Sequence, residues 1–98
     1  MEKGTPHCKL SVVKALIEAG KVRSTVSALA GGAELGFNFA GIVGVIMDLT
    51  TADFYKSMTT HADHQVWQDV YRPATPAGEV YLKLTVIDEV LIVSFKEL

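Results

Sequence analysis

The spacing of apolar residues changes halfway along the chain, and this change limits the possible folds more than any other feature of the sequence. Before Asp53, apolar residues recur every three or four positions, as they do on one face of a helix. From Asp53 onward they alternate, which is typical of strands with one buried face. Helices followed by strands indicate an α+β fold. We expect N-terminal helices packed on one face of a C-terminal antiparallel β-sheet.

Three helices are predicted in the first half. The first has Thr5 as its N-cap and Pro6 at its first position, and it ends at Gly20. Its apolar residues at helical spacing are Leu10, Val13, Leu16 and Ile17. A weaker second helix spans residues 24–36, where two adjacent glycines each cost about 1 kcal/mol relative to alanine.

The third helix is predicted after Asn38, which is a good N-cap residue. Its apolar stripe consists of Phe39, Ile42, Val43, Ile46 and Met47. Gly41 and Gly44 in the same segment favour a close approach to another element, because glycine has no side chain to keep a neighbour away.

Four strands are predicted in the second half. Residues 80–87 and 91–96 alternate and are joined by a tight turn at Asp88-Glu89. The stretches FYKSMTT and QVWQDVYR form two more strands, joined by the polar tip HADH, and the loop PATPAG follows them. We therefore expect a four-stranded antiparallel meander.

The alternation also assigns side chains to the two faces of the sheet. Those expected to face the helices are Val80, Leu82, Leu84, Val86, Leu91, Val93 and Phe95. Those expected on the opposite face are Tyr81, Lys83, Thr85, Ile92, Ser94 and Lys96, with Tyr81 paired with Lys96 across the turn. Lys56 can share that open face. Gln68 cannot be placed, because both faces of its strand are mixed in polarity.

The open face would carry lysine cations and the phenol of Tyr81, together with the amide of Gln68 if its side chain faces the same way. This set suits an RNA phosphodiester. Lysine and arginine bind phosphate and stabilise the charge of a pentacovalent intermediate. RNA supplies its own nucleophile, the 2′-hydroxyl, so the protein need only move protons. Clustered lysines lower one another's pKa from about 10.4. Any half-exposed antiparallel sheet also has polar residues on its open face, so this pattern leaves a purely structural role open.

The chain has no convincing set of metal ligands. His61, Asp63 and His64 lie at the predicted hairpin tip, and His7 is next to Cys8. Neither group provides the four ligands of a structural zinc site. We expect solvated loop histidines, no bound metal and no cofactor.

Charge and hydropathy exclude several other classes. The net charge of −2 argues against a strong general polyanion binder, although residues 1–23 hold five cations and two carboxylates. One cysteine cannot form an intramolecular disulfide, and the polar start does not look like a signal peptide. The apolar stretch AGIVGVIM is too short to cross a bilayer. We expect a single cytoplasmic domain over residues 1–98, with no membrane association.

Several segments resemble the motility quorum-sensing regulator (MqsR) family of toxins. They are DFYKSMTT at 53–60, DHQVWQDVYRP at 63–73 and VYLKLTVIDEVLIVSFKE at 80–97, together with MEKGTPH and AGKVRST nearer the start. The resemblance spans the whole chain without an insertion. It implies a RelE/YoeB-like fold and the toxin of a type II toxin–antitoxin system. Such a toxin is a metal-independent mRNA interferase that cuts mRNA at GCU-like triplets without the ribosome.

The resemblance also implies the site residues. The family's catalytic positions fall on Lys56, Gln68, Tyr81 and Lys96. Lysines would hold the scissile phosphate or exchange protons, while Tyr81 would act as an acid or stack on a base. Gln68 would orient the phosphate or read a base edge. The expected products are a 2′,3′-cyclic phosphate, or its hydrolysed form, and a 5′-hydroxyl.

Two further cations are expected to contact RNA phosphate. Arg72 belongs to the shared VYRP motif, and Lys83 lies on the predicted open face. Toxins of this family are often basic, whereas this chain is mildly acidic, a departure that concerns RNA affinity and triplet preference and not the matched catalytic positions.

The implied partner is an MqsA-like antitoxin with a zinc-binding N-terminal domain and a helix-turn-helix C-terminal domain. The metal would then belong to the partner, and operator DNA would be bound only through it. The family is linked to transcription regulation, persistence and biofilm growth. Two alternatives remain open: a catalytically weak antitoxin-binding module that tunes repression, and a zinc-dependent nuclease that uses His61, Asp63 and His64.

Overall fold

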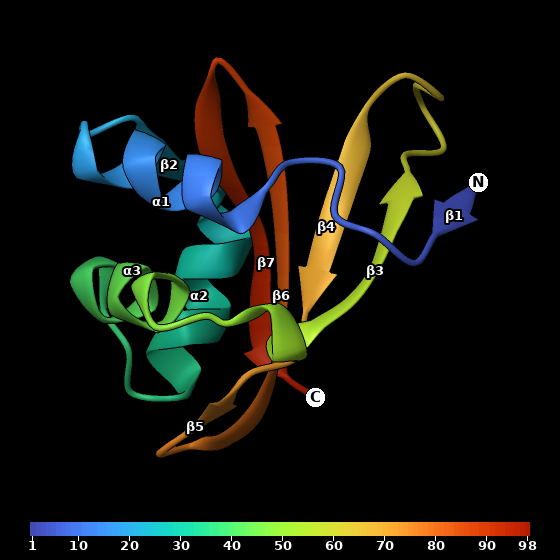
Figure 1. The fold of residues 1–98 in the computed structure, drawn as a ribbon. Helices are drawn as coiled ribbons and strands as arrows, with labels where there is room; N and C mark the ends of the chain where they lie inside the picture. The colour runs from blue at the N-terminus through green and yellow to red at the C-terminus, as the bar shows by residue number, and fades with distance from the viewer.

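Helices occupy the first half of the chain and most of the sheet comes from the second half (Figure 1). The computed structural model describes residues 1–98. The helices are α1 (Leu10–Glu18), α2 (Val26–Glu34), α3 (Phe39–Met47) and the short 3-10 helix η1 (Thr51–Asp53). The strands are β1 (Glu2–Lys3), β2 (Val22–Ser24), β3 (Phe54–Thr59), β4 (Trp67–Tyr71), β5 (Ala74–Thr75), β6 (Gly78–Ile87) and β7 (Glu89–Glu97). The α+β prediction is confirmed.

The main path of the sheet has the strand order β1-β3-β4-β6-β7-β2, and β5 pairs with β6 to one side. The four central strands are the predicted antiparallel meander. The prediction of four strands is incomplete, because β1 adds antiparallel to β3 and β2 adds parallel to β7. Both edge strands have only two or three residues, which is too short for alternation to be visible in the sequence.

The three helices lie together on one face of the sheet (Figure 1). Apolar side chains from the helices and from β6 and β7 form the core between the two layers, among them Val13, Ile42, Ile46, Leu82, Ile92 and Phe95. The tightest contact is at Gly31 of α2, where a Cβ atom would collide with the backbone carbonyl of Phe95. Gly44 has no neighbouring atom within 4 Å of such a Cβ, so the close approach expected there is wrong.

One of the two predicted N-caps is confirmed. The side chain of Asn38 accepts a hydrogen bond from the first turn of α3, and Thr25, which was not predicted as a cap, does the same for α2. The expected N-cap at Thr5 is wrong, since α1 begins only at Leu10. The reason is Asp69 on β4, whose buried carboxylate accepts hydrogen bonds from the backbone amides of residues 7 and 8 and holds this segment outside the helix.

A bulge in β7 changes the predicted faces of that strand. Lys83 pairs with Ser94, but the next residue of β6 pairs with Ile92, so Val93 is an extra residue. Phe95 faces the helices as predicted, whereas beyond the bulge Ile92, rather than Leu91, is fully buried. The assignments of Leu91, Ile92 and Val93 are therefore wrong, because simple alternation cannot anticipate an inserted residue.

Three smaller expectations have mixed outcomes. Gly20 follows α1 with φ 77°, a conformation that favours glycine, as its position predicts. Phe39 is 38% exposed and does not belong to the buried stripe of α3. The last hairpin turns at Asp88 alone, since Ile87 already pairs with Glu89.

None of the helices by itself has the length and apolar character to cross a bilayer. The helices α2 and α3 reach that threshold only when combined, and they are bent by 88° relative to each other.

Candidate functional site

The face of the sheet opposite the helices carries a row of four residues that crosses four strands. The row consists of Lys56, Val70, Lys83 and Ser94, each paired with the next. Val70 is fully buried although it lies on the open face, which is expected if the aliphatic stems of the flanking lysines cover it. Two predicted site residues, Lys56 and Lys83, therefore lie on either side of Val70 in one row of the sheet.

The next row toward the end of the sheet contains Tyr81 paired with Lys96, as predicted. The Nζ atoms of Lys96 and Lys83 lie 5.3 Å and 5.8 Å from the centre of the Tyr81 ring, within the range of cation–π attraction. Burial lowers the pKa of Lys83, and the nearby charges of Lys96 and Lys56 lower it further. The charges of Lys56 and Lys96 are therefore close enough to Lys83 to act on it.

Lys56 has a partner that the sequence did not reveal. Its Nζ atom lies 2.8 Å from a carboxylate oxygen of Glu2 on the edge strand β1. The hydrogen bond to Glu2 raises the pKa of Lys56, and the same bond lowers the pKa of Glu2. Only 27% of the Lys56 side chain is exposed. A charged ligand at this position must compete with Glu2 for the ammonium group.

Arg72 lies on the same face, but its closest aromatic neighbour was missed by the sequence analysis. The Arg72 guanidinium carbon is 4.4 Å from the centre of the Tyr55 ring, and Lys56 Nζ is 5.4 Å from it. A register shift between Phe54 and Lys56 leaves Tyr55 as an extra residue, and its side chain is half exposed. The sequence feature that points to this neighbour is the position of Tyr55 directly before Lys56, a candidate site residue.

The structure resolves the face of Gln68. Tyr71 packs in the core on the helix side, and Asp69 contacts the N-terminal segment there, so Gln68 lies with Val70 on the open face. Gln68 pairs with Met58, one row beyond Lys56. Arg72 follows Gln68 by four positions, just past the end of β4, which corresponds to about 13 Å along an extended chain. Gln68 therefore lies at the far end of the patch from Tyr81 and Lys96.

The histidines at the tip do not form a ligand set. No group of three or more His, Cys, Asp or Glu side chains is arranged to hold a metal ion. Asp63 accepts a hydrogen bond from the Gln65 amide at 2.8 Å and so organises the turn itself. His61 and His64 are exposed, as expected for solvated loop residues.

The open face is more positive than the whole chain. Its cations are Lys56, Arg72, Lys83 and Lys96, and its carboxylates include Glu2, which pairs with Lys56, and Glu79, which lines a pocket with Arg72. The net charge of the protein is nevertheless −2. Cations on a solvent-accessible sheet surface can bind a phosphate. The two tyrosines nearby, Tyr55 and Tyr81, can stack against a base.

Comparison with known proteins identifies the family of this chain. The model of a family described as "Motility quorum-sensing regulator, toxin of MqsA" matches residues 5–97. A relative from Escherichia coli (strain K12), named mRNA interferase toxin MqsR, is 62% identical over 97 residues, which cover 99% of each chain. The chain therefore belongs to the family of motility quorum-sensing regulator toxins.

Proposed function

We propose that this protein is an mRNA interferase, the toxin of a type II toxin–antitoxin system, and that residues 1–98 form its single catalytic domain. The observation that carries the proposal is the cluster of Lys56, Lys83 and Lys96 around Tyr81 on one open sheet face. The E. coli relative with 62% identity bears the name of such an enzyme. A substrate of this kind places the activity in the cytoplasm.

The cluster suits cleavage by the 2′-hydroxyl of the substrate. The 2′-oxygen attacks the adjacent phosphorus and loses its proton to a base, while the bond to the 5′-oxygen breaks and that oxygen receives a proton. The products are a 2′,3′-cyclic phosphate, which can be hydrolysed further, and a 5′-hydroxyl. The lysines would stabilise the charge that develops on the phosphate oxygens, and no metal is required for these steps.

We assign the other residues by their places on the open face. Lys56 and Lys96 hold the phosphate or exchange protons, and Tyr81 between them is the candidate acid. Gln68, at the far end, is placed to contact a neighbouring phosphate or a base edge. Arg72 contacts a second phosphate, and this spread over several nucleotides would allow selection of a GCU-like triplet.

The partner of such a toxin would be an MqsA-like antitoxin that inhibits it, carries the zinc, and binds operator DNA on behalf of the complex. The family description names MqsA as the counterpart of its toxins. Roles in transcription regulation, persistence and biofilm growth would follow from release of the toxin.

A second candidate function is a catalytically weak module that mainly binds the antitoxin and tunes repression. The ion pair between Lys56 and Glu2 favours this alternative, because it occupies one of the cations that the enzyme would need. A cleavage assay separates the two functions.

The test is incubation of the purified protein with a defined RNA that contains GCU and altered triplets, followed by mapping of the new 5′ ends. We expect cuts at GCU-like triplets, unchanged by a chelator and lost in Lys56→Ala and Tyr81→Phe. Lys21→Ala, which removes an exposed lysine outside the patch, is the matched control and should cut normally. Absence of cutting by folded wild-type protein would leave the binding module as the better explanation.

A further inference from the structure

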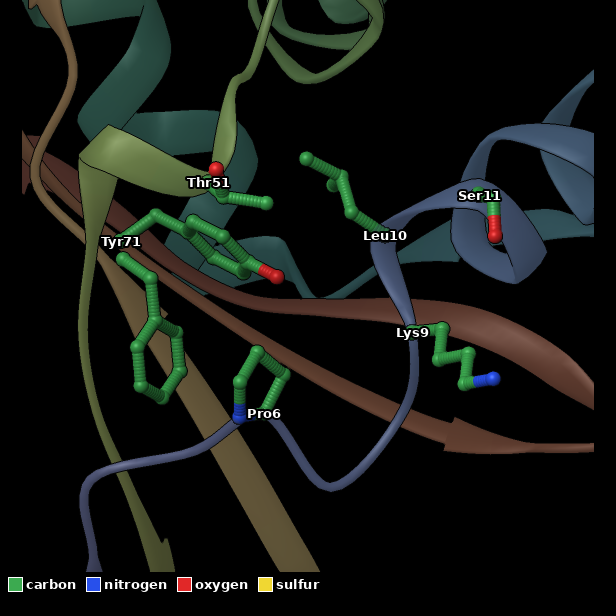
Figure 2. A pocket seen from close by; sticks show the side chains of 7 residues that line it. Pro6, Lys9, Leu10, Ser11, Thr51 and Tyr71 are labelled. Atoms are coloured by element: carbon green, nitrogen blue, oxygen red, sulfur yellow. The ribbon is translucent and has the colours of Figure 1, made fainter.

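A cavity of about 320 Å³ lies on the helix side of the sheet, away from the open face. It forms where the N-terminal segment, the start of α1, η1 and the strands β3 and β4 meet (Figure 2). The residues that line it are Pro6, Lys9, Leu10, Ser11, Thr51, Phe54 and Tyr71. This volume is at the lower end of the roughly 300–1,000 Å³ that is typical of small-molecule sites.

The Tyr71 hydroxyl points into this cavity and has no partner. Figure 2 shows it directed toward the space between Pro6, Leu10 and Thr51. The Tyr71 side chain is fully buried, and its Oη atom makes no hydrogen bond within the protein. Phe54 packs edge-on against the ring at 5.5 Å and holds its orientation. Buried hydroxyls are almost always hydrogen-bonded, so an unpaired one that faces a cavity indicates a missing partner.

The surroundings make Tyr71 a donor. Burial raises the pKa of Tyr71 to about 12, with a smaller contribution from the charge of Asp69, so the hydroxyl keeps its proton. The first turn of α1 also lines the cavity, and its N-cap residue Lys9 makes no side-chain capping bond. The Tyr71 hydroxyl is therefore an unpaired donor at this cavity, which favours an acceptor atom on the ligand.

The charges around the cavity disfavour an ionised ligand of either sign. The Asp69 carboxylate is close enough to act on the Tyr71 hydroxyl and would repel an anion. Lys9 at the cavity and the positive end of the α1 dipole would repel a cation. Pro6, Leu10 and Phe54 provide apolar walls for the remainder of the molecule.

We propose that this cavity binds a small uncharged molecule with an apolar body and one carbonyl oxygen, which accepts a hydrogen bond from the Tyr71 hydroxyl. The site is separate from the lysine cluster, which lies on the opposite face of the same sheet. Binding there can be measured without RNA, so the outcome does not depend on the proposed catalytic function.

The experiment is titration of the isotope-labelled full chain with three probes of similar shape, followed by amide chemical shifts in NMR. Acetophenone has the ring and the carbonyl, ethylbenzene lacks the acceptor, and benzoate carries a negative charge. We expect acetophenone to shift the amides of Leu10, Thr51 and Tyr71 saturably and to bind about five- to tenfold more tightly than ethylbenzene. Benzoate should bind more weakly than acetophenone.

Two variants and one control connect binding to the cavity. Tyr71→Phe keeps the shape and removes an unpaired hydroxyl, so it should fold at least as stably and bind acetophenone and ethylbenzene equally. Thr51→Phe, at an exposed residue of the rim, should fill the space and abolish both. Val12→Phe, on the exposed side of α1 and outside the cavity, should bind as the wild type does.

Several outcomes would overturn the proposal. These are shifts located elsewhere, no saturable binding by folded protein, or a preference for acetophenone that persists in Tyr71→Phe. Equal affinity of the wild type for acetophenone and ethylbenzene would mean that the Tyr71 hydroxyl bonds only water.

Discussion

At the scale of single residues, the open face depends on which charges neutralise one another. Lys83 lies between Lys56 and Lys96 and has a lowered pKa, as expected for a half-buried cation among cations. Lys56 differs from Lys83 because its ammonium group is hydrogen-bonded to the carboxylate of Glu2, which lies 54 positions away in the chain. Glu2 is thus the residue that most directly weakens the positive patch in the free protein.

We predict that Glu2→Gln raises kcat/KM for RNA cleavage by about two- to fivefold, a modest effect because the Glu2 side chain of the ion pair is 59% exposed. The amide cannot neutralise Lys56, so the ammonium group becomes available to phosphate. The measurement is the cleavage rate on a defined RNA at low salt. Glu97→Gln, an exposed carboxylate beside Lys96 in sequence, is the control for a general change in charge.

The same pair has a defined pH dependence. The pKa of Glu2 is lowered, so the pair is present above the ordinary carboxyl range and is lost as the pH falls through that lowered pKa. NMR titration of the Glu2 carboxyl should show this, with a return of its pKa toward the ordinary value in Lys56→Ala.

For the activity prediction, a lower rather than higher kcat/KM of Glu2→Gln would mean that Glu2 holds Lys56 in its working position.

At the scale of elements, the packing of α2 on β7 depends on a glycine that is unfavourable for the helix itself. Glycine costs about 1 kcal/mol in a helix relative to alanine. Gly31 is nevertheless required, because any Cβ would meet the Phe95 carbonyl. The close approach fixes α2 against the strand that carries Lys96, so the helix layer supports the open face from behind.

Gly31 and Gly44 provide a matched test of this packing. We predict that Gly31→Ala lowers the free energy of unfolding by about 1–3 kcal/mol, because overpacking outweighs the gain in helix propensity. Gly44→Ala should raise it by about 0.5–1 kcal/mol, since its Cβ meets no atom within 4 Å. Urea denaturation followed by circular dichroism measures both. Equal effects of the two changes would contradict the contact at Gly31.

At the scale of the whole molecule, the sheet separates two environments. Helices and the buried apolar residues occupy one face, and the cations of the candidate site occupy the other. This separation reconciles a net charge of −2 with the proposed binding of RNA by one surface. Carboxylates elsewhere reduce nonspecific attraction, while the local field of the patch remains positive.

We predict that binding of a noncleavable RNA, with a 2′-deoxy residue at the cut site, depends on salt as expected for about three to four phosphate contacts. The slope of log K against log salt should then be about −2 to −3. Lys96→Ala should make the slope less negative by about 0.7, and Lys21→Ala should leave it unchanged. Fluorescence anisotropy at several salt concentrations gives these values. A slope near zero would contradict a phosphate-binding face.

Residues close in sequence determined the parts of the fold that the sequence predicts well. Helical spacing and the cap at Asn38 specify the helices, because these interactions span only three or four residues. Alternation and a tight turn likewise specify the last hairpin and bring Tyr81 opposite Lys96. The open face and most of its cations therefore follow from local periodicity.

Contacts between distant residues decided the rest. The edge strands, the bulge at Val93 and the hold of Asp69 on the N-terminal segment all depend on which strands meet in space. The same is true of the pairing of Glu2 with Lys56 and of the cavity around Tyr71. Such contacts leave no periodic trace in the sequence, because each depends on one pair of segments that only the folded chain brings together.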